Sequence, residues 1–561
     1  MKFRNSAQCS DSLPSMDTKS EVTTEIIEPG TVSTTDNDPD VENSKVEGQS
    51  QEKELTYLHG WRLYISTVAL WIIIYLVNME ASIVSTALVA MTSDLHGFDK
   101  SSWIVSGYQI SYTGFLVIWA KMSDIFGRKY SLMTAVFLFA VFSGACGAAQ
   151  TMTQLIVVRV LQGIGASGAF AVTMAIVYEM VPKAKLPLYT GICFIIVALA
   201  TTSGPLMGGA IVTRGSWRWL FLLNVPAAAI VFVVLLICMP AQFGNSKSSA
   251  PSPVQKDTIW GLLKKIDVIG AVLLLGASFL LVTALLEAST SFTWSSAVVI
   301  VLLVLSVVSW VLFALWERHL SKRGKEQEEM FPWRFVKNRA WMAMLLVSFL
   351  VGIPNSAILI SIPQRYQVVD ASSPLQAGIR LLPYTIANPI GLLVGNTIGG
   401  ATKIAPIYLL FGSSLIQLLG IALFDMIPVE GGMLARVGVT ASVTMLATPH
   451  CVESKDLAVG TSSMVQARML GSAIGLAIAM TVLNSNLSAS LGSALLPSQI
   501  TSLLQDFDLL NTFNPSLQEQ VRSIFGKGFR LENRIIIAIA GVQVLAVGLM
   551  WKKKQISLHS N

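Results

Sequence analysis

Residues 120–129 read AKMSDIFGRK and lie between two long apolar runs. In this segment Asp124 and Arg128 flank Gly127, so a carboxylate and a guanidinium stand on either side of a tight turn. The carboxylate can then meet a neighbouring helix N-terminus or an arginine. Positive charge in a loop between membrane helices is expected on topological grounds, but that does not account for the full spacing. The segment therefore indicates a specific turn at the end of a helix.

The composition of the whole chain excludes most soluble proteins. Its 561 residues are 53% hydrophobic and only 13% charged, whereas an ordinary soluble domain is about 25% charged. A water-soluble protein of this length could not cover its surface with so few charges. Soluble enzymes, nucleic-acid binders and secreted disulfide-rich proteins are therefore excluded, and the chain is predicted to be an integral membrane protein.

From residue 62 onward, long apolar runs alternate with short polar breaks. A helix needs about 20 apolar residues to cross the hydrocarbon, and an open sheet edge cannot be satisfied in lipid. The runs predict an all-α membrane protein with about 14 transmembrane helices. The expected spans are 62–88, 103–122, 131–149, 155–180, 189–212, 219–239, 266–286, 296–316, 341–362, 376–398, 404–424, 433–449, 460–483 and 534–551.

The distribution of charge predicts the orientation in the membrane. Lysine and arginine gather in alternate loops, for example 121–129 and 317–340. The positive-inside rule places these loops in the cytoplasm and, with an even number of spans, both termini as well. Residues 1–60 hold 17 of the 72 charged residues and are rich in serine and threonine. They are expected to form a disordered acidic tail, and 552–561 a basic tail.

Several motifs identify the chain as a member of a known family. Residues 120–129 resemble the GxLxDxxGRK signature of the major facilitator superfamily, although Ala120 replaces the first glycine. Residues 159–163 are similar to its RxxQG pattern, and 204–209 resemble the GPxxGG core of its antiporter signature. Further stretches resemble motifs of the fourteen-span drug:proton antiporters, especially fungal members: 78–88, 217–226, 376–383 and 468–475.

The resemblance implies a major facilitator fold of two six-helix bundles plus two inserted spans, with the substrate site between the bundles. A long outer loop is expected at about 484–533. It holds a glycosylation sequon at Asn486, which lies so close to a span that we expect no glycan there. The expected segments are an N-terminal bundle at 61–240, a cytoplasmic linker at 241–265, inserted spans at 266–316, a basic cytoplasmic loop at 317–340 and a C-terminal bundle at 341–551.

Two charged residues inside predicted spans are candidates for proton coupling, because charge in hydrocarbon is expensive and is kept for function. Glu80 stands where the family usually has aspartate and keeps a titratable group in the first span. Arg159 matches the superfamily arginine implicated in proton transfer, and it would tune a nearby acid because a guanidinium does not release its proton. Alternatively, both residues could simply hold neighbouring helices together.

The resemblance also assigns gating and cavity residues. Asp124, Gly127 and Arg128 are expected to close the cytoplasmic side. Arg380 and Arg468 lie in the later motifs, and each could face either the cavity or the lipid headgroups.

The antiporter-like stretch is expected to act as a hinge in the fifth span. Gly204 and Pro205 would bend the helix, while Gly208 and Gly209 would permit close packing. A proline kink with no role in the direction of exchange is the alternative. Residues 163–168 spell GxGxxG, but inside an apolar run this pattern favours close helix packing over a nucleotide site.

The sequence thus predicts a proton-coupled exporter of small amphipathic organic compounds, such as toxins, secondary metabolites or drugs. A fungal plasma membrane is the expected location, with the vacuolar membrane as the alternative. The expected partners are the substrate, protons and the bilayer; the protein should be a monomer without enzyme activity, cofactor, metal or nucleic-acid partner. A carrier for siderophores or basic amino acids remains an alternative, as does a non-transporting membrane sensor on the same fold.

Overall fold

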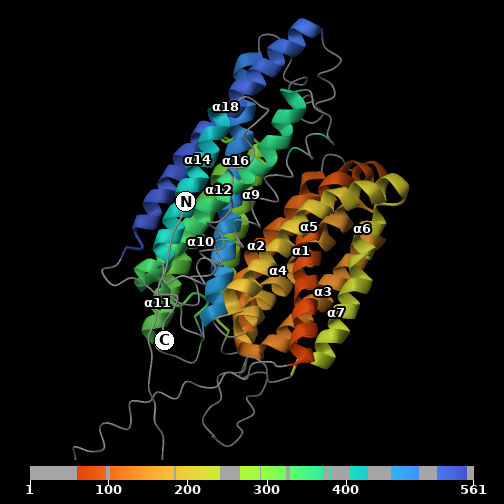
Figure 1. Cartoon of the computed structure of the whole chain (residues 1–561), viewed down its shortest axis with the longest axis vertical. Coiled ribbons are helices and arrows are strands. Elements are labelled where there is room, and N and C mark those ends of the chain that lie inside the picture. The colour runs from red at the N-terminus through yellow and green to blue at the C-terminus, as the bar shows by residue number, and fades with distance from the viewer. Residues whose placement is uncertain are drawn as a thin grey trace, which may run out of the picture. The chain divides into compact units, whose positions relative to one another are not determined.

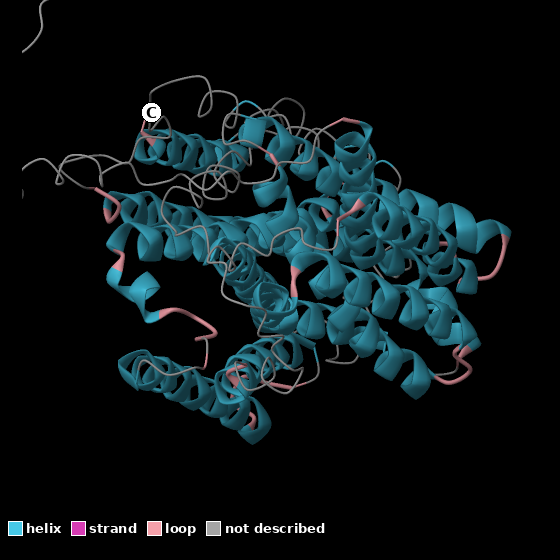
Figure 2. Cartoon of the chain, turned by 90° about the horizontal axis from the view of Figure 1, so that it is seen from below, coloured by secondary structure: helices cyan, strands magenta, loops and turns pink. Residues whose placement is uncertain are grey.

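The computed structural model describes residues 60–95, 101–181, 185–240, 266–290, 292–323, 327, 329–370, 376, 380, 391, 394, 405–426, 456–491 and 514–551. Every element that it defines in these ranges is a helix (Figure 1, Figure 2). The prediction of an all-α fold is therefore confirmed. The predicted spans 376–398 and 433–449 lie largely or wholly outside the described residues.

The predicted N-terminal bundle consists of helices that gather together in Figure 1: α1 (Trp61–Asp94), α2 (Ser101–Phe126), α3 (Arg128–Ala148), α4 (Met152–Met180), α5 (Leu186–Arg214), α6 (Arg218–Leu222) and α7 (Asn224–Cys238). α4 packs between α2 and α3, and α1 packs against α5 and α7. α6 and α7 together form the predicted sixth span, with Leu223 between them.

The later helices are α9 (Val268–Thr290), α10 (Ala297–Arg323), α11 (Trp333–Lys337), α12 (Arg339–Val368), α14 (Pro406–Met426), α16 (Leu457–Leu491) and α18 (Pro515–Gly548). α12 packs along α16 and α18, and α14 packs on α18. α9 and α10 form a pair, as expected for the inserted spans. α16 also contacts α2, α4 and α9, so it joins the two groups of helices.

Ten helices in the described part of the chain are long and apolar enough to cross a bilayer. α10 shows why this composition suits lipid. Its outer surface carries Val304, Val307 and Val311, each at least half exposed. In water such a surface would be a large apolar patch, whereas in hydrocarbon it is the expected contact with lipid.

Two predicted loops are shorter in the structure than the sequence suggested. α16 reaches Leu491 and α18 begins at Pro515, so the outer loop predicted at about 484–533 is helical at both ends. The first half of α18 is amphipathic, with charged residues beside a buried apolar stripe. Because it contains no continuous apolar run, it was not predicted as a helix. The basic loop predicted at 317–340 is likewise partly helical, because α10 continues to Arg323 and α11 follows.

Glycines let α4 approach its neighbours closely. A Cβ atom at Gly165 would lie 2.5 Å from the backbone nitrogen of Phe139 in α3, and one at Gly168 would lie 2.5 Å from the Trp119 ring in α2. Both distances are too short for a real side chain. Residues 163–168 therefore serve helix packing, as their place in an apolar run predicts.

Candidate functional site

A buried charge network centred on Glu80 lies inside the bundle of α1 to α7. Glu80 of α1 is 0% exposed and Arg159 of α4 is 1% exposed. Arg159 Nη1 donates a hydrogen bond to Glu80 Oε1 at 2.5 Å. Asn224 Nδ2, at the start of α7, donates to Glu80 Oε2, also at 2.5 Å. Three helices therefore meet at one carboxylate.

Arg159 is fixed by further contacts from α2 and from its own helix. Nη1 also donates to Gln162 Oε1 at 2.7 Å, and Nε donates to the Ile104 carbonyl at 3.2 Å. The guanidinium carbon lies 4.4 Å from the centre of the Tyr108 ring, in cation–π contact. Gln162 is held in turn by Ser143 of α3, whose hydroxyl accepts a hydrogen bond at 2.7 Å. The guanidinium is thus oriented as well as neutralised.

Glu80 and Arg159 were predicted from the sequence as site residues, whereas their polar partners were not. Gln162 and Asn224 counted only as letters of a motif. Arg159 and Gln162 are three residues apart and so share one face of α4. The sequence did contain a signal for these partners: Gln162 and Asn224 are polar residues in apolar runs, and a polar side chain that is buried there must find a hydrogen-bond partner.

This arrangement can link a proton to helix packing. Arg159 keeps its proton, so the group in this ion pair that can exchange one is Glu80. Protonation would remove the charge that balances Arg159 in a site closed to water, and an unbalanced buried charge is strongly destabilising. Among the described residues Asn224 Oδ1 has no hydrogen-bond partner, so it could accept a bond from a protonated carboxyl if the Asn224 amide turned over. A change of protonation would thus alter how α1, α4 and α7 are held.

A second ionic cluster joins the ends of α2, α3 and α4. Arg128 lies 2.6 Å from Asp124 and 2.6 Å from Glu179, and it is 3% exposed. Its Nη1 also donates to Ser123 Oγ at 2.5 Å. Gly127 makes the turn with φ of 92°, a conformation that glycine adopts without strain. The structure thus brings the three predicted gating residues together and adds Glu179, which the sequence analysis did not assign to the gate.

Gly204 of α5 lies directly against the part of α1 that carries Glu80. A Cβ atom at Gly204 would be 3.1 Å from the Met79 carbonyl oxygen and 3.1 Å from the Ile83 nitrogen, and would collide with Ser82 Oγ. Helix α5 can approach α1 so closely only because residue 204 has no side chain. The predicted hinge and the buried carboxylate therefore share a contact.

The other residues of the predicted hinge behave differently. Pro205 lies inside α5, where it removes one backbone donor, and Gly208 is buried. Gly209 was also expected to permit close packing, and this expectation is wrong. A Cβ atom there would meet nothing within 4 Å. Successive helical residues are about 100° apart around the axis, so Gly209, five positions after Gly204, points about 140° away from it and does not share its α1-facing side.

Two matched substitutions test this difference between the glycines. Gly204→Ala should lower the stability of the protein by about 1–3 kcal/mol, since the new methyl group overpacks the α1–α5 contact. Gly209→Ala should leave the stability unchanged or raise it by up to about 1 kcal/mol, because alanine is the better helix former and the space is open. Melting temperatures of full-length protein in lipid nanodiscs would compare them. Equal melting temperatures would show that α5 does not depend on the contact at residue 204.

The remaining candidates lie apart from one another. Arg380 is exposed, and its guanidinium lies 5.1 Å from the centre of the Tyr366 ring of α12. Arg468 is partly buried within α16. Asn486 lies in the last turns of α16, with its Oδ1 atom 3.7 Å from the Cβ position of Gly528 in α18. The sequon is thus part of a packed helix, which favours the expectation that it carries no glycan.

A pair of acids missed by the sequence analysis lies where α9 and α10 pack together. Asp267 and Glu317 are each 1% exposed. Trp316 Nε1 donates to Asp267 Oδ1 at 2.8 Å, and the Phe331 amide donates to Glu317 Oε1 at 3.3 Å. Asp267 is the second residue of the predicted span 266–286, and Glu317 directly follows the predicted span 296–316. At such positions a charge is normally interpreted as a solvated helix end. The inserted pair is linked to α2 because α9 packs against that helix.

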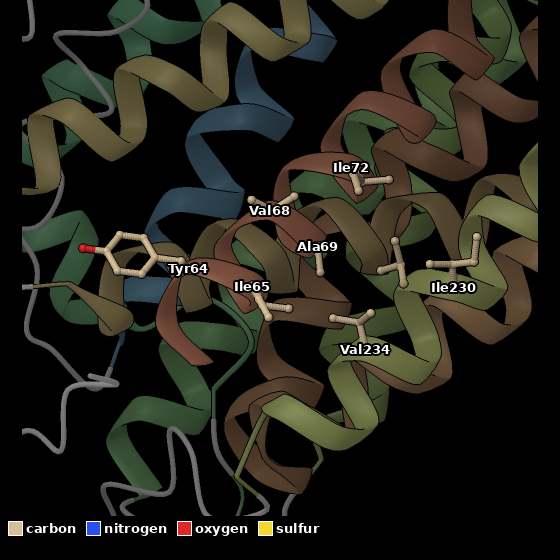
Figure 3. Close-up of a pocket in the computed structure, with 8 residues that line it drawn as sticks. Tyr64, Ile65, Val68, Ala69, Ile72, Ile230 and Val234 are labelled. Atoms are coloured by element: carbon tan, nitrogen blue, oxygen red, sulfur yellow. The ribbon is translucent and has the colours of Figure 1, made fainter. Parts of the chain in front are cut away.

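A hollow of about 250 Å³ lies between α1 and α7, but its position does not suit a cargo site. Apolar side chains line it, among them Ile65, Val68 and Ile230 (Figure 3). These three residues are 41%, 50% and 64% exposed, so the hollow opens on the outer, lipid-facing surface. Among the described residues no cluster of His, Cys, Asp and Glu could hold a metal ion.

The ten long apolar helices of the described residues indicate a multi-pass membrane protein with a buried ionic network. The chain belongs to the major facilitator superfamily. The family model described as Major Facilitator Superfamily matches residues 70–325. The MFS-type transporter FPY5 of Fusarium mangiferae is 35% identical over 532 residues, which cover 92% of this chain and 88% of the relative. Efflux pump FUS6 of Gibberella fujikuroi is 28% identical and covers 85% of this chain and 87% of its own.

Solved structures agree on the fold. A bacterial homologue of the human lysosomal transporter Spinster aligns with a TM-score of 0.54 at 12% identity, covering 89% of this chain and 100% of its own. The human organic anion transporter MFSD10 aligns with a TM-score of 0.52 at 13% identity. The alignment covers 87% of this chain and 99% of the MFSD10 chain. At these identities the likeness concerns the fold alone. The predicted family membership and the major facilitator fold are confirmed.

Proposed function

We propose that the protein is a proton-coupled exporter of small amphipathic organic compounds and that Glu80 carries the coupling proton. The observation that carries this proposal is the buried bond between Glu80 and Arg159, which Asn224 completes. An ion pair this deeply buried in a membrane protein is expensive, and a hydrophobic pair would stabilise the bundle as well. Glu80 can take up and release a proton, and this function explains why the ion pair would be kept.

The surrounding contacts suggest how a proton would move the helices. Loss of charge on Glu80 would loosen α1 from α4 and α7, and α5 would follow because Gly204 lies against the same turn of α1. At the other end of the bundle, the Arg128 cluster would hold the predicted cytoplasmic side closed until α2, α3 and α4 separate. Alternating access of this kind moves a central site between the two faces.

The direction of transport is supported by the relatives. Several of them are named efflux transporters or efflux pumps, and those cited above come from fungi. We therefore assign this chain to export across a fungal membrane, the plasma membrane being the expected one, with both termini in the cytoplasm. The cargo would leave as one or more protons enter.

Transport by purified protein in liposomes tests this proposal. Full-length protein is reconstituted into acid-inside vesicles, and accumulation of two fluorescent probes is followed: ethidium, a permanent cation, and dansylglycine, an amphipathic carboxylate. At least one of them should accumulate above the level of empty vesicles. A protonophore, which removes the pH gradient, should abolish that accumulation.

Two results would contradict the proposal, provided that the protein is shown to be folded and inserted. One is accumulation that is insensitive to the protonophore, since the gradient would then not drive it. The other is no accumulation of either probe, which would reject a broad proton-coupled exporter.

A further inference from the structure

We propose that Arg468 recognises an acidic group on the cargo, so that the preferred substrates are amphipathic organic anions, carboxylates foremost. This inference deepens the proposed function by naming the substrate class, and it rests on that function. It starts from a guanidinium for which the described residues offer no carboxylate partner.

Arg468 lies near the middle of the membrane. It is the twelfth residue of α16, and at 1.5 Å per residue it stands about 17 Å along the helix from its first turn. That is roughly half of the 30 Å hydrocarbon thickness. Tyr112, the twelfth residue of α2, is at a similar depth on the helix that faces α16. A lipid headgroup would bind near a helix end, so this depth argues against headgroup binding.

Four arginines among the described residues have a carboxylate partner, whereas Arg468 has none there. Among the described residues no Asp or Glu comes within ion-pair distance of its guanidinium, and its electrostatic partner is the neutral side chain of Tyr112. A guanidinium without a counter-ion at this depth is destabilising, so an anion that arrives with the cargo would relieve the cost. The paired arginines are Arg128 with Asp124 and Glu179, Arg159 with Glu80, Arg218 with Asp94, and Arg334 with Asp456.

The neighbourhood of Arg468 supplies what an amphipathic anion needs. Arg468 is partly buried, and its guanidinium offers fixed donors that match a carboxylate. Tyr112 stacks on Tyr108 with ring centres 6.0 Å apart and also contacts Phe170 at 6.2 Å, so apolar aromatic surface is close by. Gln109 of α2, whose amide contacts Met469, lies on the same boundary between α2 and α16. A cargo molecule with its apolar part beside the aromatic rings and its acidic group on Arg468 would satisfy both the rings and the guanidinium.

The site would also be close to the proton network. Tyr108, the partner of Tyr112 in the stack, lies under the guanidinium of Arg159. An anion bound at Arg468 would therefore be connected to the Glu80 site through Tyr112, Tyr108 and Arg159. Recognition of cargo and binding of the proton would occur on neighbouring groups.

A binding experiment with two matched probes tests the assignment. Full-length protein in phosphatidylcholine nanodiscs is titrated with dansylglycine and with its neutral amide, dansylglycinamide. The wild type should bind the carboxylate about tenfold more tightly than the amide, as a charge-assisted bond predicts. Arg468→Gln should bring this ratio to about one by weakening only the carboxylate, and Arg468→Lys should keep part of it. Arg530→Gln, a matched change at an exposed arginine of α18, should leave the ratio unchanged.

The melting temperature separates recognition from a structural role. If Arg468 serves the cargo, Arg468→Gln should melt at the same temperature as the wild type or higher, because it removes an unbalanced charge. A lower melting temperature, no carboxylate preference in the wild type, or a preference that survives Arg468→Gln would overturn the assignment. Loss of the wild-type carboxylate preference when phosphatidylglycerol is added would also overturn the assignment, since the anion that Arg468 binds would then be a lipid headgroup. Ethidium accumulation that persists through any of these failures would leave the proposed export function standing.

Discussion

Glu80→Gln is expected to reduce proton-driven accumulation of cargo to the level of empty vesicles. Glutamine keeps the shape and one hydrogen-bond acceptor for Arg159, but it cannot carry a proton between the two faces of the membrane. Exchange of labelled for unlabelled cargo without a pH gradient needs no net proton movement, so it should continue. The measurements are acid-inside accumulation and counterflow with the same protein preparation.

The matched control for this variant is Glu80→Asp. It keeps the titratable group on a shorter side chain, so it should retain a measurable part of the accumulation. Stability must be checked in parallel, because Arg159 becomes a buried charge without a balancing carboxylate. Breaking a buried pair costs about 3–5 kcal/mol, and the retained amide oxygen should keep the loss at the low end of that range. Full accumulation by a folded Glu80→Gln protein would assign the coupling to another group.

Arg128→Ala is expected to have the second large effect, on both stability and transport. The substitution leaves Asp124 and Glu179 as neighbouring carboxylates without their shared cation, a change that costs about 3–5 kcal/mol. The ends of α2, α3 and α4 would separate, and the uptake rate should fall by at least about tenfold, the equivalent of 1.4 kcal/mol in the barrier. Melting temperature and initial uptake rate would measure the two effects.

Two further variants show whether the unpaired acid is the cause. Arg128→Ala combined with Glu179→Gln removes one of the two carboxylates, so it should recover part of the lost stability; non-additivity of this kind identifies residues that interact directly. Arg530→Ala is the control, since Arg530 is exposed and its loss should change little. If the double variant is no more stable than Arg128→Ala, the gate does not depend on the bond to Glu179.

The fold could be predicted from the sequence largely because lipid imposes one strong condition. Runs of about 20 apolar residues must be helices, and most of the predicted spans coincide with described helices. The prediction failed where that condition weakens. The first half of α18 is an amphipathic helix with buried Val521, Phe525 and Phe529, and it was assigned to a loop because it contains charged residues.

The candidate site was predictable in part, for a related physical reason. Glu80 and Arg159 are charges in apolar runs, so each is conspicuous by itself. Their partnership is not, because 79 positions separate them and only the packing of α1 on α4 brings them together. Asn224 and Glu179 stand in motifs but were not assigned to the sites for the same reason. Gly209 was assigned a packing role by analogy with its neighbours, whereas the side of the helix it occupies decides the role.

The contact at Gly204 has a consequence for energy conservation. Contact this close leaves no void in which α5 could shift while the Glu80 turn of α1 stays still. In an exporter of the proposed kind, a proton that crosses without cargo is slip, and slip dissipates the gradient as heat. Slip requires the two helices to move independently of each other. The missing side chain at position 204 would then set how much of the gradient is converted into exported cargo.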